Sequence, residues 1–405
     1  MLLSLAFKNL TRYGRRSLLT LILIAFSITV YLWMDGITRG IREQSFDNLI
    51  NFETGHIQIR TKEYDEKKPF SEKNFLTDQN EIAAKLLKFD FVTGICMRTR
   101  LIGEIDNGRD SVPVVAWGIE PEKDKDVFNL YDFISEGALT EGGALLGKSL
   151  ASDLDMGIGD YVYFTTRTTG GMLDSIELEV TGIVDSADPG VNNTAIFISL
   201  SDAEKFIDMK GVSQIAVKTR SLAALKTYCK TISEAFPDHD VLDWKQLGES
   251  FITFAETDWK YGLLFIYLFL FLAFVGFANT MLMSVYEKKR EIGTLKALGM
   301  TDLQMQGVFV LEGFWLGLAG CLTGIVFGTL FIWYFTRHPL DYSKIMGGDQ
   351  SNLGYKVLGK IPARWSIVPF YTSVLMSLIT SMGASIFAAR QTTKMSPAEC
   401  LRTKQ

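Results

Sequence analysis

The chain has 405 residues, of which 47% are hydrophobic and 21% charged, and its formal net charge is −5. Of its 41 basic and 46 acidic side chains, Glu312 alone lies within the four long apolar segments 17–34, 261–286, 307–336 and 365–389. An α-helix rises about 1.5 Å per residue, so each segment can cross the hydrocarbon core of a bilayer. A wholly soluble protein is therefore excluded.

The first apolar segment, 17–34, follows a basic stretch that contains Lys8, Arg12, Arg15 and Arg16. Its Leu, Ile, Phe and Val residues favour membrane insertion by about 3 to 6 kcal/mol. A signal peptide would have a shorter apolar core and a cleavage site of small residues, and the following MDGITRG contains no such site. The sequence therefore predicts an uncleaved transmembrane helix.

Basic residues predict the orientation of the spans. Segment 1–16, the loop 287–306 and the tail 390–405 each carry four Lys or Arg residues, which indicates a cytoplasmic position. The loop 337–364 carries five, so the contrast is modest. Four spans with both termini in the cytoplasm are consistent with this pattern and place residues 35–260 on the outer side. That domain has 24 basic and 39 acidic residues, and such an acidic surface argues against a nucleic-acid partner.

Strand and helix patterns alternate within 35–260, which predicts an α+β domain. Residues 36–50 continue the first span as a helix, and residues 245–260 lead as a helix into the second. Asn107-Gly108 and Gly170-Gly171 each separate two extended runs and predict hairpins. Further strands are expected at 55–61, 195–200 and 214–219, and further helices at 78–89, 201–208 and 221–236.

Residues 142–149, GGALLGKS, match the phosphate-loop pattern through Gly142, Gly147, Lys148 and Ser149. A phosphate loop requires a buried hydrophobic strand before its first glycine, and here SEGALTE precedes it. The predicted topology also places this segment away from cytoplasmic ATP. We interpret it as a structural strand-turn-helix element, and we expect this chain to bind no cofactor.

The cysteines follow no metal-binding pattern, because no CxxC occurs and the chain has 3 histidines. Cys96 and Cys229 lie in the outer domain, Cys321 in a span and Cys400 in the tail. A disulfide between Cys96 and Cys229 and two buried free thiols remain open alternatives.

The loop after the second span predicts a short amphipathic helix. Its apolar residues fall along one side, with basic residues on a neighbouring face: Ile292, Leu295, Leu298 and Gly299, beside Lys289 and Lys296. Such a helix can insert into a groove of a partner protein or rest on anionic lipid. Spacing alone does not separate these interpretations.

The same stretch resembles the signature of FtsX/MacB-like ABC transporter permeases, R-x-R-E-I-G-x-x-x-A-L-G-A followed by E-G-x-x-x-G-x-x-G. The matching residues are Lys288, Arg290, Glu291, Ile292, Gly293, Ala297, Leu298, Gly299, Glu312, Gly313 and Gly317, and Met300 replaces the usual alanine. Residues 6–28 and 388–402 resemble the family's two ends. GHIQIRTKEY, LLGKSLASDLDMGIGD and LEVTGIVDS are similar to the outer domain of lipoprotein-releasing Lol permeases.

The resemblance implies a permease subunit of the bacterial inner membrane with no ATPase of its own, so that the chain itself is not an enzyme. It would pair with a second permease, either identical or paralogous, and with two copies of a separate cytoplasmic ATPase that binds ATP and Mg. The residues that would dock on the ATPase are Glu287, Lys288, Lys289, Arg290, Glu291, Ile292, Gly293, Leu295, Lys296, Ala297, Leu298, Gly299 and Met300.

Lipoprotein release to a carrier is the favoured function. MacB-like export of peptides or drugs and FtsX-like control of cell-wall hydrolases are the alternatives. The hairpin at 165–176 lies where Lol permeases recruit the carrier, which makes Arg167, Met172 and Leu173 contact residues in one interpretation and part of a solvated turn in the other.

The third span carries a face of small residues suited to close helix packing: Gly313, Gly317, Gly320, Gly324 and Gly328. Glu312, near the cytoplasmic edge, is interpreted as a helix-interface residue. A hydrophilic transport path would need more ionisable groups within the spans. The spans are therefore predicted to pack and tilt.

Overall fold

The computed structural model describes residues 14–341, 355–357 and 359–393. Residues 1–13 of the predicted cytoplasmic segment 1–16, and residues 394–405 of the predicted tail 390–405, lie outside the described residues. The chain forms two compact units. The helical unit contains residues up to Gly40, Glu256–Leu340 and the chain from Pro362 onward. The outer unit contains Ile41–Ala255 and Asp341–Ile361. The predicted loop 337–364 is thus divided between the units.

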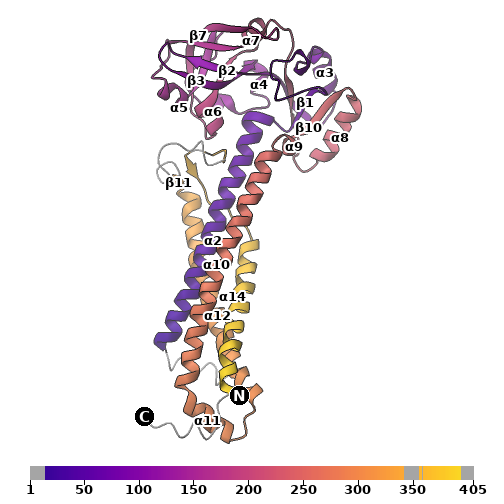
Figure 1. Cartoon of the computed structure of the whole chain (residues 1–405). Helices are drawn as coiled ribbons and strands as arrows, with labels where there is room; N and C mark the ends of the chain where they lie inside the picture. The colour runs from indigo at the N-terminus through magenta and orange to yellow at the C-terminus, as the bar shows by residue number, and fades with distance from the viewer. Residues whose placement is uncertain (1–13, 342–354, 358, 394–405) are drawn as a thin grey trace. The chain divides into compact units, whose positions relative to one another are not determined.

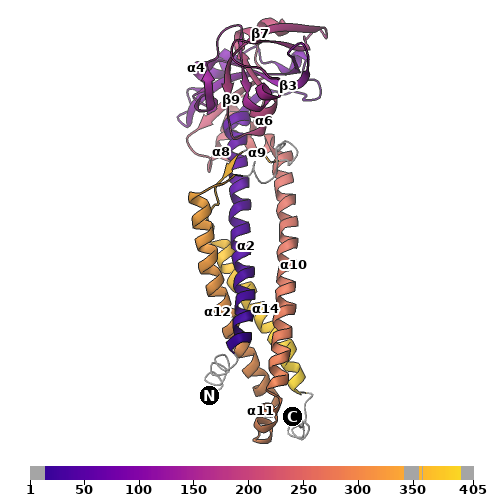
Figure 2. The same ribbon diagram turned by 90° about the vertical axis from the view of Figure 1, so that its left-hand side faces the viewer.

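Among the described residues, four helices are long and apolar enough to cross a membrane, as predicted from the four apolar segments. They are α2 (Gly14–Asn48), α10 (Glu249–Glu287), α12 (Asp302–Arg337) and α14 (Val368–Thr393), and the short α11 (Lys289–Ala297) joins α10 to α12 (Figure 1). Within the helical unit, α2 runs between α12 and α10 in the view of Figure 2. Both α2 and α10 extend beyond their apolar segments, which confirms the predicted helical continuations.

The outer unit is an α+β domain built on a ten-stranded mixed sheet, which confirms the predicted fold class. Its strands are β1 (Ile57–Thr61), β2 (Val92–Asp106), β3 (Ser111–Ile119), β4 (Ile134–Gly137), β5 (Gly143–Gly147), β6 (Tyr161–Arg167), β7 (Leu173–Val184), β8 (Ala195–Ser199), β9 (Gln214–Thr219) and β10 (His239–Asp243). Strands β11 (Leu340–Asp341) and β12 (Lys360–Ile361) form a separate pair.

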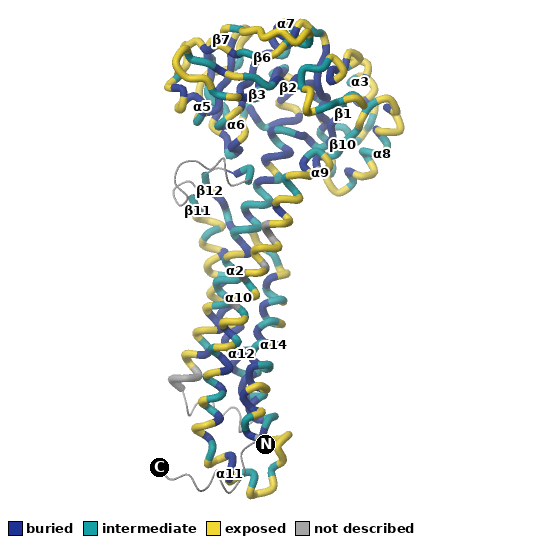
Figure 3. The backbone as a smooth tube through the Cα atoms, in the orientation of Figure 1, coloured by how far each residue is buried: buried dark blue, intermediate teal, exposed yellow. Residues whose placement is uncertain are grey.

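Six strands of this sheet close into a ring. The order β2-β3-β8-β5-β7 is completed by β6, which pairs with both β7 and β2. The ring encloses a core of aliphatic side chains and Phe164. At Gly103 of β2, a Cβ atom would lie 2.3 Å from the Thr165 carbonyl oxygen, so this position must be glycine for β6 to close the ring. Strands β2 and β3 are buried along much of their length, while exposed residues gather in the connecting loops (Figure 3).

Six short α-helices lie between strands within the described part of the outer unit, and a seventh, α9 (Trp244–Leu247), leads from β10 to α10. The six are α3 (Gln79–Leu86), α4 (Pro121–Asp124), α5 (Lys148–Asp153), α6 (Pro189–Thr194), α7 (Leu200–Ile207) and α8 (Leu225–Ala235). The hairpins predicted at Asn107-Gly108 and Gly170-Gly171 connect β2 to β3 and β6 to β7, respectively. The secondary structure of the outer domain therefore follows the local sequence pattern closely.

The GGALLGKS segment forms strand β5 and the start of α5, as expected for a structural element. The strand lies inside the motif, whereas a phosphate loop would place it before the first glycine. The Lys148 ammonium lies 2.5 Å from a carboxylate oxygen of Asp185. This arrangement leaves the motif without the phosphate-loop geometry.

Cys96, Cys229 and Cys321 are free thiols, which resolves the open alternative against a Cys96–Cys229 disulfide. Cys96 is buried, while Cys229 is half-buried. Burial raises the pKa of both the Cys96 and Cys229 thiols, so their reactive thiolate forms are disfavoured.

A buried arginine anchors the point where α2 enters the outer unit. After Asn48 the chain forms one π-helical segment, η1 (Leu49–Thr54). The Arg98 guanidinium donates to the Phe52 carbonyl oxygen at 2.6 Å and binds both carboxylate oxygens of Asp124 at 2.6 and 2.9 Å. Arg98 is 0% exposed and stacks on the Phe128 ring at 3.3 Å. The η1 segment that follows α2 is therefore bonded directly to strand β2.

Candidate coupling helix and membrane cavity

The predicted coupling stretch forms helix α11 with a defined end at each side. Glu287 ends α10, and Lys288 precedes the first turn of α11. At the other end, the Gly299 amide donates to Lys296 and the Met300 amide to Leu295. Gly299 has φ +93°, a conformation that L side chains rarely adopt, which explains the glycine of the family signature.

Lys288 is part of the protein interior. Its ammonium lies 2.8 and 3.0 Å from the two carboxylate oxygens of Glu312, and the two residues are 3% and 4% exposed. The Phe309 ring lies 5.5 Å from the same ammonium. The interpretation of Glu312 as a helix-interface residue matches this geometry. Lys288 is buried and connects α11 to α12, and its docking on an ATPase stays a prediction.

Lys296 makes a second connection within the chain. Its ammonium donates to the Thr392 carbonyl oxygen at 2.7 Å, near the end of α14, and lies 2.7 Å from Asp302 at the start of α12. A cation is favourable at a helix C-terminus and an acid in a first turn, so both contacts suit the helix dipoles. Lys296 therefore fastens α11 to both following spans.

The apolar side of α11 is divided between the core and the surface. Ile292 is 2% exposed and packs within the helical unit, so it is not available as the predicted apolar anchor, because its own chain already covers it. Leu295 is half-buried, while Leu298 is 79% exposed. Gly293 is buried and Lys289 half-buried, and the exposed residues are Glu287, Arg290, Glu291, Thr294, Ala297, Leu298 and Gly299. Helical spacing places Glu291, Thr294 and Leu298, which directly follows α11, along one outward face.

The glycine face of α12 packs against two different helices. An added Cβ would lie 1.8 Å from Ser385 Oγ at Gly313 and 2.2 Å from Ser381 Oγ at Gly317, both on α14. Further along α12, the neighbours of Gly320, Gly324 and Gly328 are Ile24, Ala25 with Ile28, and Leu32 of α2. The absence of side chains at these glycines thus lets the backbones of α2, α12 and α14 lie close together.

A row of serines on α14 complements these glycines. Ser373, Ser377, Ser381 and Ser385 are buried and recur every four residues, which places them on one face of the helix. Ser377 Oγ donates to the Gly317 carbonyl oxygen at 3.0 Å. This serine row was not predicted, although serines that recur every four residues within an apolar segment indicate a packed polar face on a helix.

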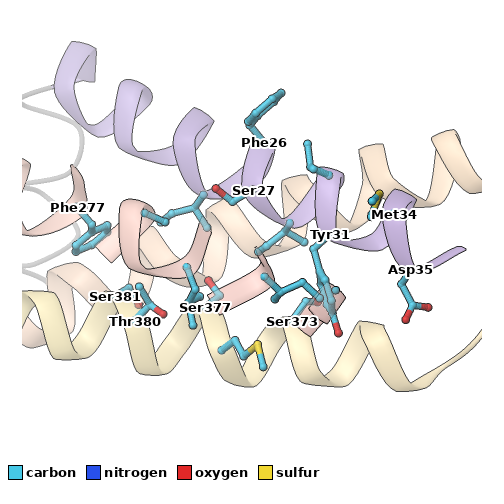
Figure 4. Close-up of a pocket in the computed structure, with 18 of the residues that line it drawn as sticks. Phe26, Ser27, Tyr31, Met34, Asp35, Phe277, Ser373, Ser377, Thr380 and Ser381 are labelled. Carbon is cyan, nitrogen blue, oxygen red and sulfur yellow. The ribbon is translucent and has the colours of Figure 1, made fainter. Parts of the chain in front are cut away.

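A cavity of about 480 Å³ lies within the helical unit, lined by α2, α10 and α14. Tyr31 and Asp35 contribute from α2, Phe277 from α10, and Ser377 and Thr380 from α14 (Figure 4). The remaining lining is predominantly apolar. The Asp35 carboxylate, the charged group of the lining, lies 3.4 Å from the Arg39 guanidinium. The volume falls in the range of small-molecule and lipid-chain sites.

The rim of this cavity reaches the outside of the helix bundle. Phe26, Met34 and Tyr261 line the cavity and are exposed. Phe26 and Met34 belong to the apolar segment 17–34. The cavity therefore opens beside helix residues that are expected to face lipid.

The hairpin between β6 and β7 brings together the three residues predicted as a carrier contact. Arg167 pairs with Leu173 at the end of the ladder, and Met172 lies in the turn. All three side chains are exposed. The Thr168 amide donates to the Met172 carbonyl oxygen at 2.8 Å, which closes a solvated turn. Both interpretations of this hairpin are compatible with its geometry.

Metal-ion chemistry finds no support in this geometry. No group of three or more His, Cys, Asp or Glu side chains that could hold a metal ion occurs within residues 14–341 and the described part of the C-terminal segment. The features that remain for function are a docking helix, a cavity between spans and an outer domain.

Within the described residues, one long apolar helix precedes the α+β domain and three follow it, with the short α11 between the second and third. The chain belongs to the family with a MacB-like periplasmic core domain, whose model matches residues 17–233. Residues 263–397 match the FtsX-like permease C-terminal family. The chain is thus an ABC transporter permease of the FtsX/MacB/LolC type.

The chain is similar to several known proteins over much of its length. The lipoprotein-releasing system transmembrane protein LolC of Neisseria meningitidis is 25% identical over 70% of this chain and 72% of its own length. An uncharacterized ABC transporter permease of Methanocaldococcus jannaschii is 23% identical over 99% of this chain and 97% of its own length. The periplasmic region of MacB from Actinobacillus actinomycetemcomitans aligns with 51% of this chain and 97% of that chain, at 14% identity and a TM-score of 0.36.

Proposed function

We propose that this permease extracts lipid-anchored proteins from the outer leaflet of a bacterial inner membrane, driven by a separate cytoplasmic ATPase dimer, and hands them to a soluble carrier. In this proposal both termini and α11 are cytoplasmic, residues 35–260 are periplasmic, and the chain acts with a second permease, identical or paralogous. ATP and Mg bind to the partner ATPase. The cavity between α2, α10 and α14 is the observation that carries the proposal.

An acyl chain fits this cavity better than a hydrophilic solute does. Its lining is largely apolar, and its exposed rim at Phe26 lies in a segment that would be surrounded by lipid. A lipid anchor could enter from the bilayer without crossing water, which avoids most of the cost of exposing its methylene groups, about 0.8 kcal/mol each. The LolC relatives support the same substrate class.

Filling the cavity is expected to block the extraction step. Thr380→Trp adds a large ring to the cavity wall and should lower release of a lipid-anchored substrate at least about tenfold, since it removes the volume an acyl chain needs. Release into solution is measured in proteoliposomes that contain the permeases, the ATPase, the lipoprotein and the carrier. Thr323→Trp on α12, which is outside the cavity lining, is the matched control. Unchanged release by the Thr380 variant would count against lipoprotein extraction and favour MacB-like export of soluble cargo.

Coupling to the ATPase is assigned to the outward face of α11. Leu298 is the most exposed apolar residue of that helix and its end. Leu298→Asp would place a charge in the partner groove and should reduce ATPase co-purification and coupled release at least about tenfold, which corresponds to a loss of about 1.4 kcal/mol.

Leu87→Asp is the control for this experiment, because Leu87 is also strongly exposed but lies in the outer unit. Co-purification with the ATPase is measured by affinity capture from solubilised membranes. A Leu298 variant that binds and couples normally would show that α11 rests on lipid headgroups and not in a protein groove.

A further inference from the structure

A short segment from the loop between the third and fourth spans lies against both helical entries of the outer unit. The Asn48 side-chain amide, at the end of α2, donates to the Lys356 carbonyl oxygen at 2.6 Å. The Tyr355 ring lies at 5.6 Å, edge-on, from the Phe254 ring of α10. Val357 is buried. Residues 355–357, here called the strap, therefore contact the ends of two helices that are far apart in sequence.

The Lys356 side chain interacts with two carboxylates, those of Glu53 and Asp188. Its ammonium forms an ion pair with Glu53 of η1. Asp188 is 2% exposed, and one of its oxygens caps α6 by accepting from the Gly190 amide at 2.7 Å. Its second oxygen is buried and has no hydrogen-bond partner within the described residues. The Asn48 amide also donates to the Ala187 carbonyl oxygen at 3.0 Å, so one side chain holds the strap beside the residue that precedes Asp188.

The three charges depend on one another. Burial would lower the pKa of Lys356, but the charges of Glu53 and Asp188 outweigh it and raise that pKa. Burial would raise the pKa of Glu53, and the Lys356 charge holds it below its ordinary value. Burial raises the pKa of Asp188 despite the opposing Lys356 charge. Without the lysine, Glu53 would lose its ion-pair partner, and the buried Asp188 carboxylate would lose a favourable charge.

The chain just beyond the strap is fastened within the helical unit. The Ala363 amide donates to the Phe335 carbonyl oxygen at 3.3 Å, and Thr336 Oγ1 donates to the Ala363 carbonyl oxygen at 2.8 Å. The Arg364 amide donates to the Gly36 carbonyl oxygen at 2.9 Å. The end of α12 and the chain leading into α14 are therefore joined by hydrogen bonds, only a few residues after Lys356 in the sequence.

We infer that the strap is a third mechanical connection to the outer unit, beside α2 and α10, in which Lys356, paired with Glu53, carries movement of α12 and α14 to the ends of α2 and α10. Lys356 is thus a positioning residue. The inference rests on the proposed function only for the source of the movement, which is the ATPase acting on α11. Lys288 connects α11 to α12, and Lys296 connects α11 to α14. The contacts of α11 and the contacts of the strap therefore involve the same two spans, α12 and α14.

Hydrogen exchange of the full-length protein in lipid nanodiscs tests whether the strap is fastened. Lys356→Met should accelerate exchange about tenfold or more in peptides that contain 355–357 and α6, because it removes a charge-assisted contact that protects both. Peptides from β6 and β7 should not change. Lys356→Arg should retain the protection, and Lys360→Met, an exposed lysine four residues later, is the matched control. Unchanged exchange in the Lys356→Met variant would overturn the strap.

Transmission is tested in the complex with the partner ATPase. ATP with orthovanadate should alter exchange in the outer unit of the unmodified protein, and Lys356→Met should abolish that change. ATP hydrolysis by the variant complex, measured without orthovanadate, should continue. An ATP-dependent change that survives in the variant would refute transmission through Lys356. Neither readout involves cargo, so a failure of lipoprotein release in the original chain would reject the proposed function while leaving the strap intact.

Discussion

Replacing Glu312 with alanine is expected to destabilise the helical unit by about 3 to 5 kcal/mol, because the Lys288 ammonium would remain buried without its partner. Both residues are almost fully covered, and neither carboxylate oxygen of Glu312 is farther than 3.0 Å from the ammonium. The loss is measured as a lower midpoint of unfolding of the full-length protein in a mild detergent.

A double replacement distinguishes the ion pair from simple packing. Lys288→Met combined with Glu312→Met removes both charges while keeping apolar volume, and such replacements of buried pairs are often neutral or stabilising. The double variant should therefore recover most of the stability that the Glu312→Ala variant loses. Equal destabilisation of the single and double variants would show that the shape of these side chains matters and their charges do not.

Replacing Arg98 with methionine should destabilise the outer unit by about 3 to 5 kcal/mol, since it strands the Asp124 carboxylate in the core and leaves the Phe52 carbonyl oxygen without its donor. The expected result is a lower unfolding midpoint by intrinsic tryptophan fluorescence, and Trp117 lies 5.5 Å from the guanidinium. It should also increase protease cleavage near η1.

Arg109→Met is the control for Arg98, because Arg109 lies exposed in the turn between β2 and β3. It should change the free energy of unfolding by no more than about 0.5 kcal/mol, as is usual for surface positions. If the Arg98 variant were equally mild, the anchoring of α2 to β2 would have to reside in the aliphatic packing around Leu49 and Ile50, and the buried ion pair would contribute little.

Local sequence pattern was a reliable guide to the secondary structure. The four apolar segments lie in α2, α10, α12 and α14, and the Asn107-Gly108 and Gly170-Gly171 turns close the expected hairpins. These features depend on hydropathy and backbone preference, which are properties of neighbouring residues. Closure of the six-stranded ring was not foreseen, because the pairing of β6 with β2 joins residues about 60 positions apart.

The coupling stretch shows most clearly what local pattern predicts and what it leaves to tertiary packing. Its spacing predicted a helix, and α11 is a helix. The same spacing placed Ile292 and Leu298 on one side, yet Ile292 is buried in the chain's own core and Leu298 is exposed. A helical pattern identifies which residues share a face, but it does not say whether that face is covered by the same chain or by a partner.

The sequence by itself determined the four apolar helices, the α+β character of the intervening domain and the family signature, because membrane partitioning and secondary-structure preference accumulate residue by residue. The tertiary structure alone decided the partners of Glu312, Arg98 and Lys356 and the serine row that meets the glycines of α12. A buried charge must find an opposite charge in space, and the folded path of the chain places that partner at a sequence separation no local pattern records.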